Sequence, residues 1–274
     1  EGGRLTLSGG AITNNEATGK GTINNPSGGG GVLIGRSGAM DMTGGEVSNN
    51  ISADVGGGIT VGGGMSSAYV AQDTHPTFTM TGGTIRSCTA TAGHGGGICS
   101  VRQMSISGSA VVTDCKAGGS YVSSGAMLIS PDSTYTAVIA GGTFDGNVVN
   151  NKSTTITGGT FSGEVQNSGV IENGQFNGAV NNYEGTIKGG TFYGSVKNSG
   201  ECDLGTPFHI GTISGGTFNG TVTNEAAGRI SGGTYNGSVY GTFYTVAFVS
   251  NGGTAVPNQK YANTPVTAPT VSRA

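Results

Sequence analysis

Charged residues, tryptophan and long hydrophobic runs are all scarce in this sequence. Only 10% of its 274 residues are charged, there is no tryptophan, and the formal net charge is −3. No run of about 18 apolar residues occurs, so the sequence predicts neither a transmembrane helix nor membrane insertion. Basic clusters are missing as well, which argues against nucleic acid as a partner, because phosphate binding needs grouped lysines and arginines.

Cysteine is rare too, and the four cysteines form neither a C-x-x-C pair nor a dense disulfide framework. Glycine, in contrast, accounts for 56 of the 274 residues, against a usual share of about 7%. The glycines follow no G-X-Y period, which excludes collagen. With many Val, Ile, Thr, Ser and Asn residues around them, they indicate short strands joined by tight turns. Because the chain begins at Glu1 without a signal peptide, we expect a mature or excised piece of a longer protein.

The second half of the sequence is a tandem repeat, which is the strongest guide to the fold. Each unit from residue 137 onward has an isoleucine, an aromatic residue five positions later and a valine four positions further on. The isoleucines recur after 17, 15, 16, 26 and 17 residues, and the long step holds an insertion at 199–210. The isoleucine column is Ile139, Ile156, Ile171, Ile187, Ile213 and Ile230, the aromatic column is Phe144, Phe161, Phe176, Phe192, Phe218 and Tyr235, and the valine column is Val148, Val165, Val180, Val196, Val222 and Val239.

This repeat predicts a single-chain parallel β-helix. The large apolar side chains of one unit cannot form a core alone, but stacking the units at about 4.8 Å per coil turns each column into a continuous ladder. Each strand would pair in parallel with the next coil, which satisfies its backbone groups. Helices are disfavoured because the paired glycines of each unit would cost about 1 kcal/mol per glycine.

Two further columns predict turn structure. The first glycine of each pair is replaced once, by Asn173, and asparagine is the non-glycine residue that best tolerates positive φ, so we expect a left-handed turn at that column. A column of asparagines follows the valines and should form hydrogen bonds along the axis. Its members are Asn150, Asn167, Asn182, Asn198 and Asn224.

The first half of the sequence is a looser version of the same pattern. Leu7, Met42, Met80 and Ile106 take the isoleucine position, at steps of 35, 38 and 26 residues. A second motif, GGG followed by apolar residues, lies between these units and predicts an extra strand in each early coil. We therefore expect about ten coils over 1–243, wide in 1–136 and narrow in 137–243. The crossover preference favours right-handed winding, with a left-handed form still open for such short coils.

Several short motifs resemble those of bacterial surface proteins. The GGA(I/V) and GGT-F-x-G units look like those of autotransporter-type and adhesin-like β-helices, and the expected solenoid is similar to that of the pectate lyases. GGAI at Gly9–Ile12 and TFDGN at Thr143–Asn147 are similar to the short repeats of chlamydial polymorphic membrane proteins. The resemblance implies a secreted protein on a bacterial cell surface.

The end of the chain resembles a different module. YTVAFVSNGGTAVPNQKYANTPVTAP, at 244–269, is similar to the Listeria–Bacteroides repeat, the internalin B-type repeat. The G-Y-x-F-x-G-W segment that normally follows is not present, so 244–274 is expected to be a partial β module. This family occurs in wall-attached, multi-module proteins of Gram-positive and gut bacteria. The resemblance thus implies an extracellular location and a monomeric fragment of a larger protein.

We expect this chain to be a non-catalytic adhesin or structural stalk that binds host or dietary glycans, or a host surface protein. The first alternative is a polysaccharide lyase or glycoside hydrolase. A glycosidase needs two carboxylates about 5–5.5 Å or about 6.5–9.5 Å apart, and no column supplies such a pair. The second alternative is ice binding by stacked threonines, but Gln175, Lys188 and Glu172 interrupt the threonine face.

Few residues stand out as candidates for a site, and the sequence predicts no catalytic residue, metal or cofactor. Asp73 and His75, with His94, could bind a metal or a sugar from the loop at 65–77, although a solvated loop is the simpler interpretation. The insertion at 199–210 offers Phe208 and His209 as a second binding surface, or as side chains that only pack over the helix.

The cysteines pose a question of register. Cys88 takes the position that Asn15 and Asn50 take in earlier coils. Cys115 follows one coil later, within disulfide reach, although Asp114 fits the same position equally well. Cys99 is expected within a strand and Cys202 in the insertion. Free buried thiols are the favoured state.

Overall fold

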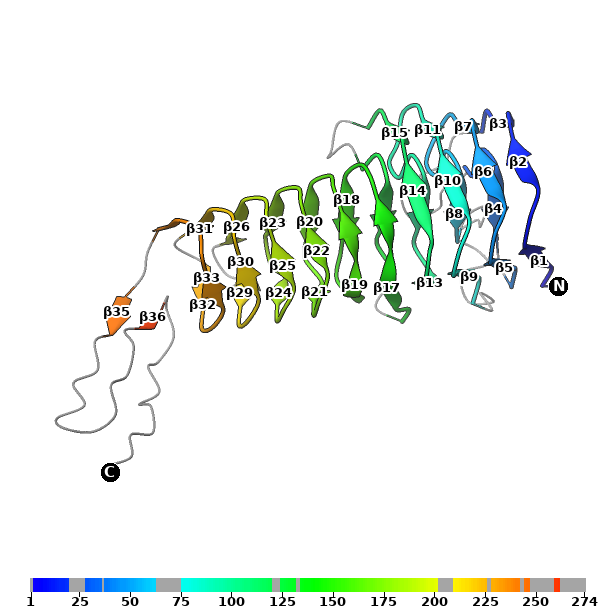
Figure 1. Cartoon of the computed structure of the whole chain (residues 1–274). Coiled ribbons are helices and arrows are strands. Elements are labelled where there is room, and N and C mark those ends of the chain that lie inside the picture. The colour runs from blue at the N-terminus through cyan, green and yellow to red at the C-terminus, as the bar shows by residue number, and fades with distance from the viewer. Residues whose placement is uncertain are drawn as a thin grey trace, which may run out of the picture.

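The protein is an elongated, single-chain parallel β-helix whose first and last coils lie at opposite ends (Figure 1). The computed structural model describes residues 2–19, 28–35, 37–62, 75–119, 124–131, 134–201, 209–225, 228–241, 244–246 and 259–261. Across these ranges every regular element is a strand, and none is a helix that could cross a membrane. The expected all-β solenoid is therefore confirmed, while its right-handed winding stays a prediction.

Two sheets run the whole length of the helix. The larger, 18-stranded sheet contributes to each coil either two short strands or one long strand. Its strands are β1 (Arg4–Leu7), β2 (Ala11–Thr13), β5 (Ala39–Met42), β6 (Glu46–Ser48), β9 (Thr77–Met80), β10 (Thr84–Arg86), β13 (Gln103–Ile106), β14 (Val111–Thr113), β17 (Ala137–Phe144), β19 (Thr154–Phe161), β21 (Val170–Ile171), β22 (Gln175–Phe176), β24 (Thr186–Ile187), β25 (Thr191–Phe192), β29 (Thr212–Ile213), β30 (Thr217–Phe218), β32 (Arg229–Ile230) and β33 (Thr234–Tyr235). The second, 10-stranded sheet comprises β4 (Val32–Ile34), β8 (Ile59–Val61), β12 (Ile98–Ser100), β16 (Met127–Ile129), β18 (Val148–Asn150), β20 (Val165–Asn167), β23 (Val180–Asn182), β26 (Val196–Asn198), β31 (Val222–Asn224) and β34 (Val239–Gly241).

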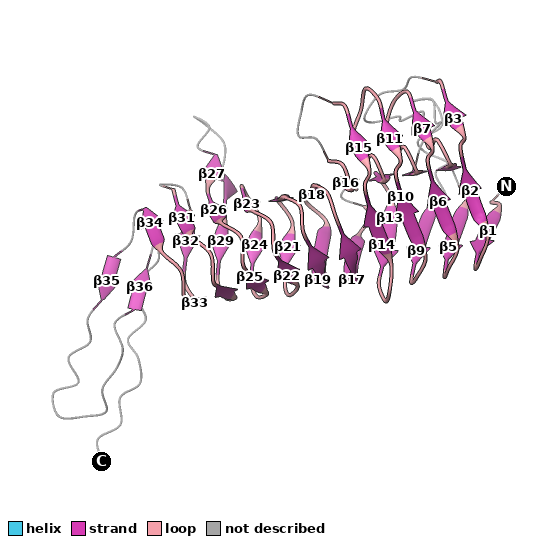
Figure 2. Ribbon diagram, turned by 45° about the horizontal axis from the view of Figure 1, so that its top comes forward, coloured by secondary structure: helices cyan, strands magenta, loops and turns pink. Residues whose placement is uncertain are grey.

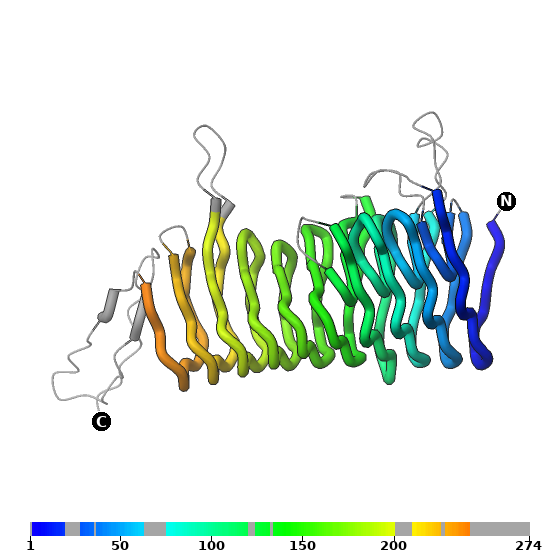
Figure 3. The backbone as a smooth tube through the Cα atoms, turned by 90° about the horizontal axis from the view of Figure 1, so that it is seen from above, coloured from blue at the N-terminus to red at the C-terminus, as the bar shows by residue number. Residues whose placement is uncertain are grey.

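Strand register aligns the two halves of the sequence in one continuous pile of ten coils. The aliphatic ladder starts at Leu7 and passes through Met42, Met80 and Ile106 before it reaches Ile139. It then continues through the isoleucines of the narrow coils to Ile230. Figure 3, seen from above, shows the coils following one another along a single axis. One buried apolar cluster extends through this pile from end to end.

The aromatic column forms a stack of rings inside the narrow coils. Neighbouring ring centroids from Phe144 to Tyr235 lie 4.7–4.9 Å apart, with interplanar angles between 5° and 18°. This spacing is that of hydrogen-bonded strands, because in-register pairing places each ring over the corresponding ring of the next coil. The stack ends at Tyr235, whose hydroxyl donates a hydrogen bond to the Gly232 carbonyl at 2.7 Å. The predicted Phe ladder is confirmed.

The predicted asparagine ladder is confirmed as well, and it is buried. From Asn150 to Asn224, each Nδ2 donates to the Oδ1 of the next asparagine at 2.6–2.7 Å. Asn167, Asn182, Asn198 and Asn224 also donate Nδ2 to a nearby backbone carbonyl. These bonds satisfy the amides of Asn167, Asn182, Asn198 and Asn224, which would otherwise be costly to bury, since each is at most 1% exposed. At the start of the ladder, Asn150 Oδ1 is buried without a hydrogen-bond partner.

The prediction for the glycine pairs was wrong by one residue. Positive φ occurs at the second glycine of each pair, for example at Gly174 (134°) and Gly190 (105°), and not at the first. Asn173 therefore occupies the first position without a left-handed backbone. Its side chain instead forms a local hydrogen bond, in which Asn173 Oδ1 accepts from the Gly174 amide at 2.9 Å.

The early coils do contain an extra strand, but it is not the GGG strand. The GGG segments lead into the same sheet as the valine strands, with Val32 in the column that later holds Val148. The added strands form a separate 4-stranded sheet, seen above β2, β6, β10 and β14 in Figure 1. They are β3 (Glu16–Ala17), β7 (Ile51–Ser52), β11 (Thr89–Ala90) and β15 (Lys116–Ala117).

Two antiparallel pairs lie outside the coil pattern. β27 (Gly200–Glu201) pairs with β28 (His209–Ile210) within the insertion, projecting from the helix side in Figure 2. β35 (Tyr244–Val246) pairs with β36 (Gln259–Tyr261) near the C-terminus. The second pair agrees with the β structure expected after residue 243, whereas the likeness to the Listeria–Bacteroides repeat and the exact domain division stay predictions.

Candidate functional site

The residues expected to bind from the early loop have different surroundings. Asp73 lies outside the described residues. His75 is exposed and its ring packs edge-on against Tyr135, with ring centroids 5.4 Å apart. His94 is half-buried, and its carbonyl accepts a hydrogen bond from the Gly56 amide at 3.0 Å. Across the described residues, no group of three His, Cys, Asp or Glu side chains is placed to hold a metal ion.

Tyr135 has a second partner beside His75. The Arg102 guanidinium carbon lies 5.0 Å from the centre of the Tyr135 ring, in cation–π range. Arg102 is only 8% exposed, and its Nη1 donates to the Val101 carbonyl at 2.9 Å. His75 and Arg102 thus contact the same ring, and Arg102 lies two residues after β12, the GGG strand of the third coil.

The insertion at 199–210 is described only in part. His209 pairs through its backbone with Glu201 in the β27–β28 hairpin. Phe208 lies outside the described residues, as does Cys202. The suggestion that this insertion forms a binding surface therefore stays a prediction.

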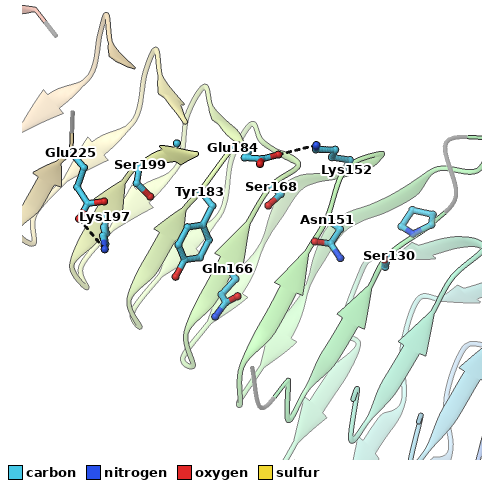
Figure 4. Close-up of a pocket in the computed structure, with 12 residues that line it drawn as sticks. Ser130, Asn151, Lys152, Gln166, Ser168, Tyr183, Glu184, Lys197, Ser199 and Glu225 are labelled. Carbon is cyan, nitrogen blue, oxygen red and sulfur yellow. Dashed lines mark ion pairs between the residues drawn. The ribbon is translucent and has the colours of Figure 1, made fainter. Parts of the chain in front are cut away.

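One depression on the surface was not predicted. It is a groove of about 750 Å³ that runs along the axis at the edge of the 10-stranded sheet (Figure 4). Six successive coils contribute to it, mostly through the residues that follow each strand of this sheet, with Gln166 and Lys197 added from within their strands. One residue from each coil, in order, is Ser130, Asn151, Gln166, Tyr183, Lys197 and Glu225.

Among the described residues that line this axial groove, Tyr183 is the one aromatic side chain. It follows Asn182 directly and is 41% exposed, so its backbone is fixed by the buried ladder while its ring remains accessible. Figure 4 shows the ring standing in the middle of the groove, between Gln166 and Lys197. The corresponding positions in neighbouring coils carry the short side chains of Ser168 and Ser199.

Two ion pairs join coils along the axial groove. Lys152 Nζ lies 2.8 Å from Glu184 Oε2, which joins two coils across the coil that carries Ser168. Lys197 Nζ lies 2.9 Å from Glu225 Oε1, which joins adjacent coils. The hydrogen bond and charge of Glu225 raise the pKa of Lys197 above its usual range. The described lining residues thus pair two positive charges with two negative ones.

A sequence signal for this groove existed, but it was weak. The position after each asparagine of the ladder reads Asn151, Ser168, Tyr183, Ser199 and Glu225, a polar column with one aromatic exception. Such a column has no repeated residue type, so a search for periodicity passes over it. Gln166, from mid-strand, adds an amide whose Nε2 donates to Glu164 Oε1 at 3.2 Å.

The register of the cysteines is resolved. Cys88 lies opposite Cys115, because Arg86 pairs with Thr113 two residues earlier. Ser87 and Asp114 share the left-handed corner at φ 53°, so Asp114 does not take the position of Cys88. Cys88, Cys99 and Cys115 are all buried free thiols, in agreement with the favoured prediction. A hydrogen bond from Cys115 lowers the pKa of Cys88 to about 7 and raises that of Cys115, while burial raises the pKa of Cys99 to about 12.

Burial should protect these thiols from reagents. In a Cys202→Ser variant, we expect Cys88, Cys99 and Cys115 to stay unreacted with Ellman's reagent in the native state, because they are at most 7% exposed. All three should react after unfolding in guanidinium chloride. Fast reaction of the native protein would contradict the described packing, and a single reactive thiol after unfolding would show that Cys88 and Cys115 had formed a disulfide.

Comparisons with known proteins provide no relative for this chain, since no protein-family model, no curated protein and no solved structure matches it.

Proposed function

We propose that this chain is a non-catalytic shaft of an extracellular bacterial surface protein, of the adhesin type. The observation that supports this role most directly is the unbroken pile of ten coils with its stacked aromatic and asparagine ladders. Strands that are hydrogen-bonded on both sides, over a dry core, resist bending and local unfolding. A long rigid element of this kind holds a binding surface away from the cell.

The likeness to surface β-helices and to the internalin B-type repeat adds the proposed setting. In this proposed setting, the chain is one part of a larger, wall-attached protein of a Gram-positive bacterium. Low charge and the scarcity of long loops in the narrow coils suit an environment rich in proteases. The axial groove supports an adhesive contribution from the shaft itself.

Solution scattering and proteolysis test the shaft. Nine steps of about 4.8 Å between the first and tenth coil predict a rod with a stiff section about 43 Å long. The distance distribution should have the skewed form of a rod, and trypsin should cut only within or beside the loops while 137–201 stays intact. A globular or broadly flexible distribution would contradict a rigid shaft.

Location needs a separate experiment. An antibody raised against the chain should bind intact cells of the bacterium that makes it, and brief proteolysis of those cells should remove the signal. Antibody access only after lysis would contradict the extracellular placement while leaving the rod geometry unaffected.

A further inference from the structure

We propose that the axial groove binds a linear, electrically neutral polysaccharide that lies along the helix axis. This inference deepens the proposed adhesive role, because it names a ligand class and a site for it. It depends on the shape, the functional groups and the charge balance of the lining.

The shape of the axial groove favours an extended polymer. From Ser130 to Glu225 the lining passes through six coils, or five steps of about 4.8 Å, which gives a length of about 24 Å. The groove has the same lateral position on every coil, because the strands beneath it are in register. A compact metabolite would contact only one or two coils, whereas a polymer chain can contact all six.

The functional groups favour a ligand rich in hydroxyls. The lining offers half-buried serine hydroxyls at Ser130 and Ser168 and carboxamides at Asn151 and Gln166, which both donate and accept hydrogen bonds. A sugar presents matching hydroxyls around its ring edge. It also presents a face of C–H groups that packs on an aromatic ring, and Tyr183 places such a ring midway along the groove.

The charge pattern favours a neutral ligand. Lys152 is paired with Glu184, and Lys197 with Glu225, so the charges of the described lining residues balance. A uronate or sulfated chain would approach two carboxylates with no excess of cations to offset the repulsion. The ion pairs instead hold four long side chains in place, which reduces the entropy lost when a ligand binds.

The support beneath the groove is rigid. Tyr183 adjoins Asn182, which receives a hydrogen bond from Asn167 at 2.6 Å and donates one to Asn198 at 2.7 Å. The Tyr183 amide itself donates to the Asn167 carbonyl at 3.1 Å. A binding residue on so fixed a backbone is presented in one orientation, as recognition of a repeating polymer requires.

Calorimetric titration of the full chain tests this proposal. The probes are neutral hexasaccharides of cellulose, xylan, mannan and β-1,3-glucan, with hexagalacturonate and a heparin hexasaccharide as charged counterparts. We expect at least one neutral probe to bind, and both charged probes to bind at least about tenfold more weakly. Tyr183→Ala should weaken the neutral probe about tenfold by removing the stacking surface, while Tyr183→Phe should keep the affinity within about twofold.

Tyr193→Ala is the matched control, because Tyr193 is 54% exposed but does not line the axial groove. The Tyr193→Ala variant should bind the neutral probe with the affinity of the parent chain. Thermal unfolding should show that all three variants are folded. The proposal is overturned if no neutral probe binds, if a charged probe binds more tightly, or if Tyr183→Ala and Tyr193→Ala have the same effect. Each of these results would leave the scattering and cell-surface tests of the shaft untouched, so the two proposals fail separately.

Discussion

Phe176→Ala should lower the free energy of unfolding by about 3–5 kcal/mol, the range found when a buried phenylalanine is truncated. Phe176 is fully buried between Phe161 and Phe192, with ring centroids 4.9 and 4.7 Å away. Neither neighbour can move into the space, because hydrogen bonds on both sides fix the separation of the strands. The cavity should therefore persist, and the full cost of its lost contacts should be measured.

Urea unfolding followed by circular dichroism measures this change in the free energy of unfolding, with Tyr193→Ala as the control. Tyr193 follows Phe192 in sequence and is an aromatic residue of similar size, but it is exposed. Its truncation should cost less than about 0.5 kcal/mol. If both substitutions cost the same, the ring stack would contribute nothing beyond an ordinary surface side chain, and the predicted packing would be incorrect.

Asn182→Ala should cost about 3 kcal/mol, because it interrupts the asparagine ladder at its centre. The change removes the acceptor of Asn167 Nδ2 and the donor to Asn198 Oδ1, as well as a bond to the Gly185 carbonyl at 3.0 Å. A buried polar group left without a partner costs about 1–3 kcal/mol. Since every asparagine here is at most 1% exposed, water cannot replace the lost bonds without entering the core.

The neighbouring residue supplies the control. Asn181 lies on the outer side of the same strand, where its Nδ2 donates to Glu164 Oε1 at 2.8 Å in a partly solvated setting. Asn181→Ala should cost less than about 1 kcal/mol, because water can satisfy the Glu164 carboxylate. If Asn182→Ala and Asn181→Ala lowered the midpoint of denaturant unfolding equally, the buried ladder would not be a source of stability.

Much of this architecture is predictable because parallel, in-register pairing leaves a direct trace in the sequence. Residues that stack in space occur at the same position of each unit, so Leu7, Met42, Met80 and Ile106 could be joined to the isoleucines despite steps of up to 38 residues. The same reasoning gave the ring stack and the asparagine ladder. Inward-facing positions repeat because each must fit against its own copy.

The errors arise where local chemistry imitates a repeat rule. Asn173 suggested a left-handed backbone, but it caps the next amide through its side chain, and the left-handed residue is Gly174. The GGG segments suggested an added strand, but they are the early counterpart of the valine strands. Glycine is needed there because a Cβ at Gly58 would lie 2.7 Å from the Gly97 carbonyl oxygen, and a Cβ at Gly97 would lie 2.7 Å from that of Ala126.

The axial groove shows a different kind of limit. Its lining side chains face outward, so they do not stack against copies of themselves and carry no repeated identity. What brings Lys152 to Glu184, two coils away, is the winding of the chain, together with side-chain conformations that a linear sequence does not display. A lone aromatic residue in a polar column, Tyr183, is the only trace, and its meaning depends on knowing which side of the coil is solvated.

Nuclear Overhauser contacts between the rings of the narrow coils test most directly whether the phenylalanines of successive coils stack. With phenylalanines labelled so that each ring is resolved, we expect strong cross-peaks from Phe161 to Phe176 and from Phe176 to Phe192, because these rings lie 4.7–4.9 Å apart. Phe161 and Phe192, two coils apart, should show at most a weak peak. Missing contacts between successive rings, or three rings with unrelated neighbours, would contradict the stacked β-helix and every role built on it.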